Sequence, residues 1–449
     1  MSAKKNFLNN KSNLLIIFII ILSIFLNFYL LLKWNQKNLY IKNLHVEKLR
    51  LKKIYNEEFA AAYKEKKNHN YFHFSEDSIF SENKKKYLLK KFKTNIRISI
   101  NPGKGISSAY LFNNKERYFL VSSSGKILSI IKNELYKTSK FKFHETNLVE
   151  LINDELFYQT STVGIRGVYF DEKKEDIYLS YNNKKNDNCY NISVLKGNFN
   201  KEKIIFKNFF DPPECYSDKK FKYNNFSTGQ SGGRIQNFNE EKILLTIGSH
   251  GGLGEVQKNN FLVGKTVLIS KNNGKDYQVF TKGHRNPQGL YINSEKLIIS
   301  TEHGPQGGDE INIINKNKNY GWPLASYGHH YSGANKKINQ LFPLPKEHGK
   351  DFNSPAFYFK NSIAISNLVE VDEKFNGYKS YFVASMKKNK EYGDQINLYE
   401  FSKNKNKFIL KDYLPIGERI RDLTYDKENK VIMLFLEESS SILFIKYNE

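Results

Sequence analysis

The chain has 449 residues, with 70 Lys or Arg against 46 Asp or Glu, so its formal net charge is +24. The basic residues are scattered and belong to no recognisable nucleic-acid-binding module, which argues against a nucleic-acid partner. A general bias toward Lys and Asn and an attraction to anionic membrane surfaces both remain open as explanations. The two cysteines are too few for a disulfide scaffold and lack the spacing of a metal finger.

The N-terminal region predicts a membrane anchor. Residues 1–13 are polar and are expected to be cytoplasmic, and residues 14–32 carry no charge. At about 1.5 Å per residue, that run crosses the hydrocarbon core of a bilayer. A cleaved signal peptide is the alternative, but its apolar part is shorter and is followed by small residues. Because Lys33-Trp34-Asn35 follows here, we predict a transmembrane signal anchor over residues 14–33.

The next segment, residues 34–92, predicts a helical stalk followed by a charged linker. Between residues 36 and 69 glycine and proline are absent, and apolar residues recur at helical spacing, among them Tyr40, Leu44, Leu51, Tyr55 and Phe59. This stripe is compatible with a coiled-coil dimer or with a helix that packs on its own domain. We place the start of the globular domain at residue 93.

Residues 93–449 predict an all-β domain. Short strands alternate with turns, for example at residues 117–122 and 125–130, 164–170 and 176–181, and 232–238 and 242–248. This pattern indicates a sandwich, barrel or propeller. At about 40–50 residues per blade, the length permits seven or eight propeller blades, or six with long loops. The apolar run at residues 441–447 would close a propeller by pairing with an early strand.

Turn-forming, charged and aromatic residues are densest at residues 283–323. Residues 289–293 and 296–301 predict two strands around a turn. A loop rich in glycine and charge follows at residues 302–310, and a further strand resumes near Ile311. Two polar loops are thereby expected at one end of the strands, where propellers place their ligand sites.

Four motifs in this stretch, GHRNPQGL, EHGP, DEIN and NYGWP, follow in order. In order and spacing they resemble the glucose/sorbosone dehydrogenase family, the soluble quinoprotein aldose sugar dehydrogenases. The resemblance implies a six-bladed β-propeller that binds pyrroloquinoline quinone (PQQ) and Ca²⁺ at one end of its axis. The flanking lysines do not determine membrane orientation. The family and the cysteine pair together imply a single-pass protein of the inner membrane with a periplasmic propeller.

The two cysteines, Cys189 and Cys215, lie in a loop-rich part of the domain. In an oxidising compartment a disulfide between them would stabilise the fold by roughly 3 kcal/mol. Two unpaired thiols are the alternative.

The resemblance also assigns cofactor and metal contacts. PQQ is a flat tricarboxylate, and the planar fork of arginine matches a carboxylate. The family's cofactor contacts map to Arg285, Asn286, Lys387, Arg419 and Arg421. A solvated charge is the alternative for each alone, above all for Lys387 among its neighbouring lysines. Ca²⁺ takes oxygen ligands, including backbone carbonyls, and the family's carbonyl ligands map to Gly304 and Pro305.

The chain departs from the family where proton chemistry is expected. In the family a His takes the C1 hydroxyl proton of the sugar while hydride passes to the quinone. That position maps to Gln230, or to Gly229 if one glycine is inserted, and neither is basic. The acidic partner maps to Ser249 and a substrate-side Gln maps to Thr162. These three changes indicate a remodelled substrate pocket.

His250 is the candidate replacement base, because it follows Ser249 directly and histidine accepts protons near neutral pH. A loop histidine with a purely structural role is the alternative. The sequence thus supports three hypotheses: an anchored quinoprotein oxidoreductase acting on an aldose or another alcohol, a non-catalytic propeller that binds a ligand, glycan or protein, and a structural envelope protein on a stalk. Neither the electron acceptor nor the oligomeric state is predicted.

Overall fold

The computed structural model describes residues 23, 26–27, 29–34, 71–73, 80–84, 87–93, 108–134, 140–186, 189–199, 203–223, 225–332 and 336–447. The chain divides into two compact units, Met1–His69 and Asn70–Glu449. Most of the predicted anchor at residues 14–33 lies outside the described residues, and its described part, including residues 29–34, is helical. The predicted stalk at residues 36–69 also lies outside them. None of the described helices has the length and apolar character needed to cross a bilayer.

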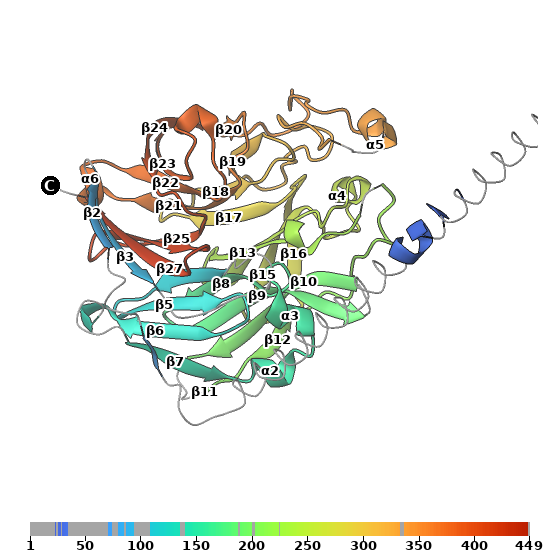
Figure 1. Cartoon of the computed structure of the whole chain (residues 1–449). Coiled ribbons are helices and arrows are strands. Elements are labelled where there is room, and N and C mark those ends of the chain that lie inside the picture. Colours follow the sequence, from blue (N-terminus) through green and yellow to red (C-terminus); the bar gives the residue numbers. More distant parts are fainter. Residues whose placement is uncertain are drawn as a thin grey trace, which may run out of the picture. The chain divides into compact units, whose positions relative to one another are not determined.

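The described part of the second unit forms six β-sheets (Figure 1). The first sheet contains β4 (Ala109–Asn113), β5 (Arg117–Ser122), β6 (Ile127–Ile131), β7 (Lys140–Thr146), β1 (Tyr71–His73) and β11 (Lys203–Ile204). The second contains β8 (Ile165–Asp171), β9 (Asp176–Asn186), β10 (Cys189–Asn198) and β12 (Lys207–Phe210). The third contains β13 (Gly232–Asn237), β14 (Lys242–Ile247), β15 (Lys265–Ser270) and β16 (Tyr277–Lys282).

The remaining three sheets repeat this meander. The fourth contains β17 (Pro287–Ile292), β18 (Ile298–Glu302), β19 (Asp309–Ile313) and β20 (Phe357–Phe359). The fifth contains β21 (Ile365–Val371), β22 (Ser380–Ser385), β23 (Asn397–Asn404) and β24 (Lys407–Pro415). The sixth contains β25 (Ile420–Asp426), β26 (Val431–Leu436), β27 (Ser441–Tyr447), β3 (Tyr87–Lys93) and β2 (Phe80–Lys84).

The first strands of the six sheets form a ring. β13 contacts β8 and β17, β21 contacts β17 and β25, and β4 contacts β25 and β8. A closed ring of six meandering sheets is a six-bladed β-propeller, so the predicted fold is confirmed. The predicted strands at residues 289–293 and 296–301 are β17 and β18, within a few residues at each end.

The last strand closes the ring as predicted. β27 pairs antiparallel with β3, from Ser441 opposite Lys93 to Tyr447 opposite Tyr87. β3 lies in the segment that we expected to be a linker, so the propeller begins earlier than the predicted boundary at residue 93. A charged strand such as YLLKKFK gives a weak local signal, and only its pairing with β27 identifies it.

The helices are short and lie on connections between strands. They are α2 (Leu148–Leu151), α3 (Glu155–Gln159), α4 (Gly254–Gln257), α5 (Lys336–Leu341), α6 (Glu373–Asn376) and the 3₁₀ turns η2 (Lys132–Glu134), η3 (Thr228–Gln230) and η4 (Lys390–Tyr392). The core lies between neighbouring blades. The β26 sequence VIMLFL is wholly buried, because both faces of a middle strand pack against adjacent sheets.

A recurrent irregularity shapes the axis. In five of the six described blades, the pairing register shifts near the start of the innermost strand, for example between Gly232 and Ile235 and between Ile420 and Asp422. Such β-bulges re-aim side chains and are frequent beside functional sites. Here the residues at the register shifts include Arg166, Arg234, Gln288 and Arg421, which are buried polar side chains.

Candidate functional site

The sequence-predicted site residues lie at one end of the propeller axis. They occupy loops that lead into innermost strands or leave second strands. The pairing of Gly232 with Ile247, Pro287 with Glu302 and Ile420 with Leu436 places these loops together. Residues far apart in sequence, such as Gln230 and Arg421, thus belong to the same end of the fold.

Arg285 is buried immediately before β17. Its backbone N–H donates to the Glu302 carboxylate, and its Nη1 donates to the His303 carbonyl at 3.1 Å. The guanidinium lies over the rings of Trp322 and Tyr331, 5.3 and 6.0 Å from their centres. Its Nε is buried and has no hydrogen-bond partner among the residues that the structure describes, and burial lowers the pKa of the guanidinium. A buried cation with an unused donor suits an anionic ligand.

Arg419 and Arg421 share one carboxylate. Arg419 Nε lies 2.9 Å from Glu437 Oε2, and Arg421 Nε lies 2.5 Å from Oε1 of the same group. Burial alone would raise the pKa of Glu437, but the charges of Arg421 and Arg419 hold it below its usual value. Because two cations face one anion, the group keeps a net positive charge.

The other two candidate cofactor residues differ in surroundings. The Asn286 side chain ties blades together, accepting from the Gly232 N–H at 3.3 Å and donating to the Gly229 carbonyl at 3.3 Å. Lys387 is exposed just after β22. It lies next to Met386, whose carbonyl accepts from Arg419 Nη1 at 2.9 Å. The structure therefore brings Lys387 to the same rim as the arginine pair.

Gln230 and Ser249, at two positions where we predict a departure from the family, contact each other. Ser249 Oγ donates to Gln230 Oε1 at 3.3 Å, so Gln230, not Gly229, is the residue that meets Ser249. Close packing holds them in place, because a Cβ on Gly248 would lie 2.2 Å from the Gln230 carbonyl. Thr162 lies nearby, accepting from Thr228 Oγ1 at 3.3 Å. All three departures therefore gather around η3.

His250 is buried among aromatic rings and not at the rim. It stacks on Phe226 with ring centres 5.6 Å apart and lies 5.9 Å from the Tyr216 ring. Both ring nitrogens are buried and have no hydrogen-bond partner in the described part of the chain, and burial lowers the pKa of the imidazole to about 3. An imidazole that is enclosed and so weakly basic argues against His250 as the replacement base. We predicted His250 as a replacement base because it follows Ser249 in the sequence. In the structure Ser249 contacts Gln230, whereas His250 packs among aromatic rings.

The predicted metal ligands lie beside Arg285. The Gly304 N–H donates to Asp309 Oδ1 at 3.0 Å, which fixes the loop. Within the described ranges, no hydrogen-bond donor contacts the Gly304 or Pro305 carbonyl, and no cluster of three or more His, Cys, Asp or Glu side chains has metal-binding geometry. Any cation here would therefore depend on carbonyl oxygens, as the family mapping expects.

A small cavity of about 10 Å³ lies beside the Gly304 loop. Its lining includes Arg285, Glu302, His303 and Glu310. Burial and the charge of Arg285 lower the pKa of His303 to about 3. Burial and the charge of Glu302 raise the pKa of Glu310 well above its usual value. The cavity has room for roughly one water molecule.

Sequence reasoning missed several axial residues. Arg234 donates to the Gln288 carbonyl at 2.5 Å and to Asp422 Oδ1 at 2.8 Å. Arg166 is also buried there, and its Nε has no partner. Each of these arginines follows a glycine at the start of an innermost strand, as Arg421 does near Gly417. That repeated position was a usable signal.

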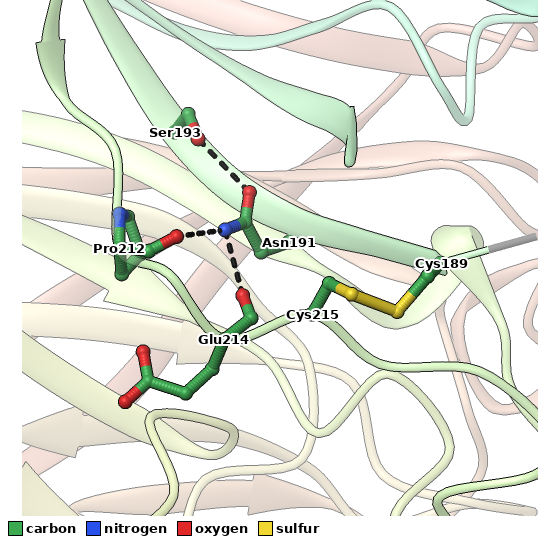
Figure 2. The surroundings of a disulfide bond; sticks show 6 residues. All are labelled: Cys189, Asn191, Ser193, Pro212, Glu214 and Cys215. Atoms are coloured by element: carbon green, nitrogen blue, oxygen red, sulfur yellow. Dashed lines mark hydrogen bonds between the residues drawn. A yellow bond between two sulfur atoms is a disulfide. The ribbon is translucent and has the colours of Figure 1, made fainter. Parts of the chain in front are cut away.

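The disulfide between Cys189 and Cys215 is formed, with Cα atoms 5.4 Å apart (Figure 2). Beside it, Asn191 Nδ2 donates to the carbonyls of Pro212 and Glu214 at 2.7 and 2.8 Å. The loop is thereby held against β10 and leads into Tyr216, the ring beside His250. The predicted pairing is confirmed.

Comparisons with known proteins agree with this geometry. The chain is 30% identical over 236 residues to aldose sugar dehydrogenase YliI of Escherichia coli (strain K12), covering 48% of this chain and 60% of that protein. It is 36% identical over 105 residues to quinoprotein glucose dehydrogenase B of Acinetobacter calcoaceticus, covering 18% of this chain and 22% of that protein. The chain thus spans less than two thirds of either relative in these alignments.

Solved structures share the fold. The apo-form of the soluble E. coli aldose sugar dehydrogenase matches with a TM-score of 0.60 and 21% identity, covering 80% of this chain and 99% of that one. The PQQ-bound aldose sugar dehydrogenase of Streptomyces coelicolor matches with a TM-score of 0.53 and 15% identity, covering 81% and 99%. The glucose/sorbosone dehydrogenase model matches residues 112–444, and the chain therefore belongs to the glucose/sorbosone dehydrogenase family.

Proposed function

We propose that this chain binds PQQ at the rim around Arg285 and acts as an oxidoreductase on an aldose or another alcohol. The observation that carries the proposal is the buried Arg285 guanidinium, which keeps an unused Nε donor. The guanidinium forms no salt bridge with any described residue, although the charges of Asp309 and Glu302 act on it. Burying a cation is costly, and an anionic ligand would offset that cost. The similarity to an aldose sugar dehydrogenase supports the same substrate class.

The charges of the rim fit a tricarboxylate. Arg419 and Arg421 together have one counter-ion in Glu437, and Lys387 adds a further exposed cation. Asn286 would contribute an amide from the neighbouring blade. We propose that Ca²⁺, if bound, takes the carbonyl oxygens of Gly304 and Pro305, because hard cations prefer oxygen ligands.

When bound, PQQ supplies a quinone that accepts hydride from the substrate carbon. The chain's own residues would bind and orient the substrate hydroxyl beside it. Gln230 can donate and accept hydrogen bonds, but an amide does not take up a proton near neutral pH. Since His250 is enclosed, the proton of the hydroxyl has no ordinary protein acceptor at this position, and we expect turnover to be slow.

A second candidate function follows from Gln230 and Ser249. Both side chains are neutral and they form a hydrogen bond with each other, which suits a propeller that holds a ligand, glycan or protein partner without turnover.

We also propose a single-pass inner-membrane protein with a periplasmic propeller. The uncharged run at residues 14–32 supports the anchor, and the disulfide supports an oxidising compartment.

The test uses the full-length chain in detergent with PQQ and Ca²⁺. Bound-quinone absorbance should appear and saturate, and a redox dye should be reduced slowly with some member of a panel of aldoses and alcohols. Binding without dye reduction would support the second candidate function. Absence of PQQ binding would sink the oxidoreductase proposal. Arg117→Ala, at the start of β5 in the first blade and bonded to Ser129 of β6, is a control that should bind PQQ normally.

A further inference from the structure

The propeller has a second cavity, which we call the axial chamber, at the end of the axis away from Arg285 and Gln230. Its volume is about 480 Å³, within the range of roughly 300–1,000 Å³ that is typical of small-molecule sites. All six innermost strands line it, through positions later along each strand than those of the candidate site, such as residues 111–113, 168–170, 234–236, 290–291, 367–370 and 422–425.

An ion pair closes the chamber toward the candidate site. Arg234 Nη1 and Asp422 Oδ1 lie 2.8 Å apart, and both residues are buried in the chamber wall. Asp422 also accepts from the Asn367 side chain and from the Leu111 N–H, each at 2.8 Å. These bonds use both oxygens of the Asp422 carboxylate and hold it in the chamber wall. The Arg234–Asp422 pair thus lies between the chamber and the PQQ rim.

The carboxylates of the chamber wall are paired with cations, in a chain that carries +24 overall. Asp422 is paired with Arg234. Glu370 lies 3.3 Å from Lys379 Nζ. Asp372 lies 3.4 Å from Lys427 Nζ. Each of these three wall carboxylates has a cationic partner, although Lys379 also pairs with Glu295 at 2.9 Å.

The rest of the wall combines aromatic rings with unused polar groups. Half-buried rings face the chamber from several blades, namely Phe112, Tyr169, Phe170, Tyr291 and Tyr425. The Tyr291 hydroxyl and the Gln236 side-chain amide make no hydrogen bond to any of the described residues. They come from β17 and β13, which are neighbours in the ring. The two groups are therefore free to bind one ligand.

We propose that the axial chamber binds a neutral, polyhydroxylated molecule of mono- or disaccharide size. The apolar C–H faces of such a ring would pack on the aromatic side chains, while its hydroxyl groups exchange hydrogen bonds with Gln236 and Tyr291. Because each wall carboxylate already has a cationic partner, we expect a neutral sugar to be preferred over an acidic or amino sugar. This site is independent of PQQ and of the proposed redox reaction.

The test is calorimetric titration of the full-length protein with glucose and maltose, and with glucosamine and gluconate as charged counterparts. At least one neutral sugar should bind saturably and more tightly than either charged one. Gln236→Leu and Tyr291→Phe should each weaken binding about five- to tenfold, the usual worth of one or two hydrogen bonds. Gln278→Leu, on the exposed side of β16 in the same blade as Gln236, should leave the affinity unchanged.

Three results would overturn the proposal. Binding lost in Arg285→Ala but retained in Gln236→Leu would place the sugar at the PQQ rim. Tighter binding of glucosamine or gluconate than of the neutral sugars would refute the argument from paired wall carboxylates. No saturable binding of any neutral sugar would refute the site itself. Tyr291→Phe removes a single oxygen that has no hydrogen-bond partner among the described residues, so an unchanged melting temperature is expected and separates lost binding from lost folding.

Discussion

Two neighbouring blades present opposite chemistry at the same rim. The cofactor side, residues 283–310, carries a buried arginine and two glutamates. The proton side, residues 227–252, carries the neutral pair Gln230 and Ser249. The two sides touch directly, since the Ser249 N–H donates to the Arg285 carbonyl at 2.7 Å. One side carries the motifs that resemble the family, and the other carries the residues that we predict to depart from it, although the backbone joins them.

This difference indicates that side chains at the loop tips can change while the backbone of the propeller stays the same. Backbone hydrogen bonds and close-packed glycines such as Gly248 hold both loops, whatever side chains occupy the tips. A fold match therefore supports a cofactor rim more strongly than it supports catalysis. The predictions below probe the contrast between the two sides, from the largest expected effect to the smallest.

Restoring the departed pair should have the largest effect. With PQQ and Ca²⁺ bound, Gln230→His combined with Ser249→Asp should raise sugar-dependent dye reduction by about 10²-fold or more, because a positioned base contributes about 10²–10⁴. Gln230→Asn with Ser249→Asp is the matched control, since it adds the acid without a base. An unchanged rate in the His variant would mean that the proton leaves by another route.

Removing the disulfide should destabilise the domain, because the loop that ends at Cys215 supports Tyr216 and His250 on the proton side. Cys189→Ser with Cys215→Ser should lower the free energy of unfolding by about 3 kcal/mol, because the unfolded chain regains the entropy of an open loop. Urea denaturation measures the loss. A reducing agent should bring the wild-type protein to the same value and leave the variant unchanged. Equal stability of oxidised wild type and variant would contradict the prediction.

Truncating the cofactor side should weaken ligand binding. Arg285→Ala should weaken PQQ binding about 10- to 100-fold, the worth of a charge-assisted hydrogen bond, as measured by absorbance titration. Arg285→Lys keeps the charge but loses the planar fork, so its affinity for PQQ should lie between those of the wild type and Arg285→Ala. If Arg285→Ala bound PQQ as tightly as Arg117→Ala, the cofactor site would have to lie elsewhere.

His250 gives a smaller, pH-dependent effect on the proton side. Its pKa in the folded protein is about 3, below the ordinary histidine value, so its contribution to stability is fully present above about pH 6.5 and is lost as the pH falls toward 3. The wild type should lose about 2 kcal/mol from this group between pH 7 and pH 5.

His250→Phe should remove that component from the pH dependence of unfolding, because phenylalanine fills the same aromatic stack without titrating. Thermal or urea unfolding at pH 7 and pH 5 gives the difference between variant and wild type. His329→Phe, an exposed histidine, is the control and should leave the pH dependence as it is. The same pH dependence in wild type and His250→Phe would show that the ring is solvated.

The sequence by itself determined the strand pattern, the closing role of β27 and the cofactor-side motifs, because each rests on neighbouring residues. The turn at Ser294-Glu295 that separates β17 from β18 is a local property. The GHRNPQGL and EHGP motifs carry Arg285 and Gly304 within a single strand pair. The cysteine pair also gave a correct prediction, since only one pairing was available to two residues.

Only the tertiary structure decided the rest, because those features depend on contacts between distant parts of the chain. β3 became a blade strand through pairing with β27. Contact with Ser249 selected Gln230 over Gly229. His250 turned out to be enclosed because Phe226 and Tyr216 approach it from a separate loop. The axial chamber required all six blades. Side chains that meet across a ring leave no local periodicity, so their partnership becomes visible only once the ring is closed.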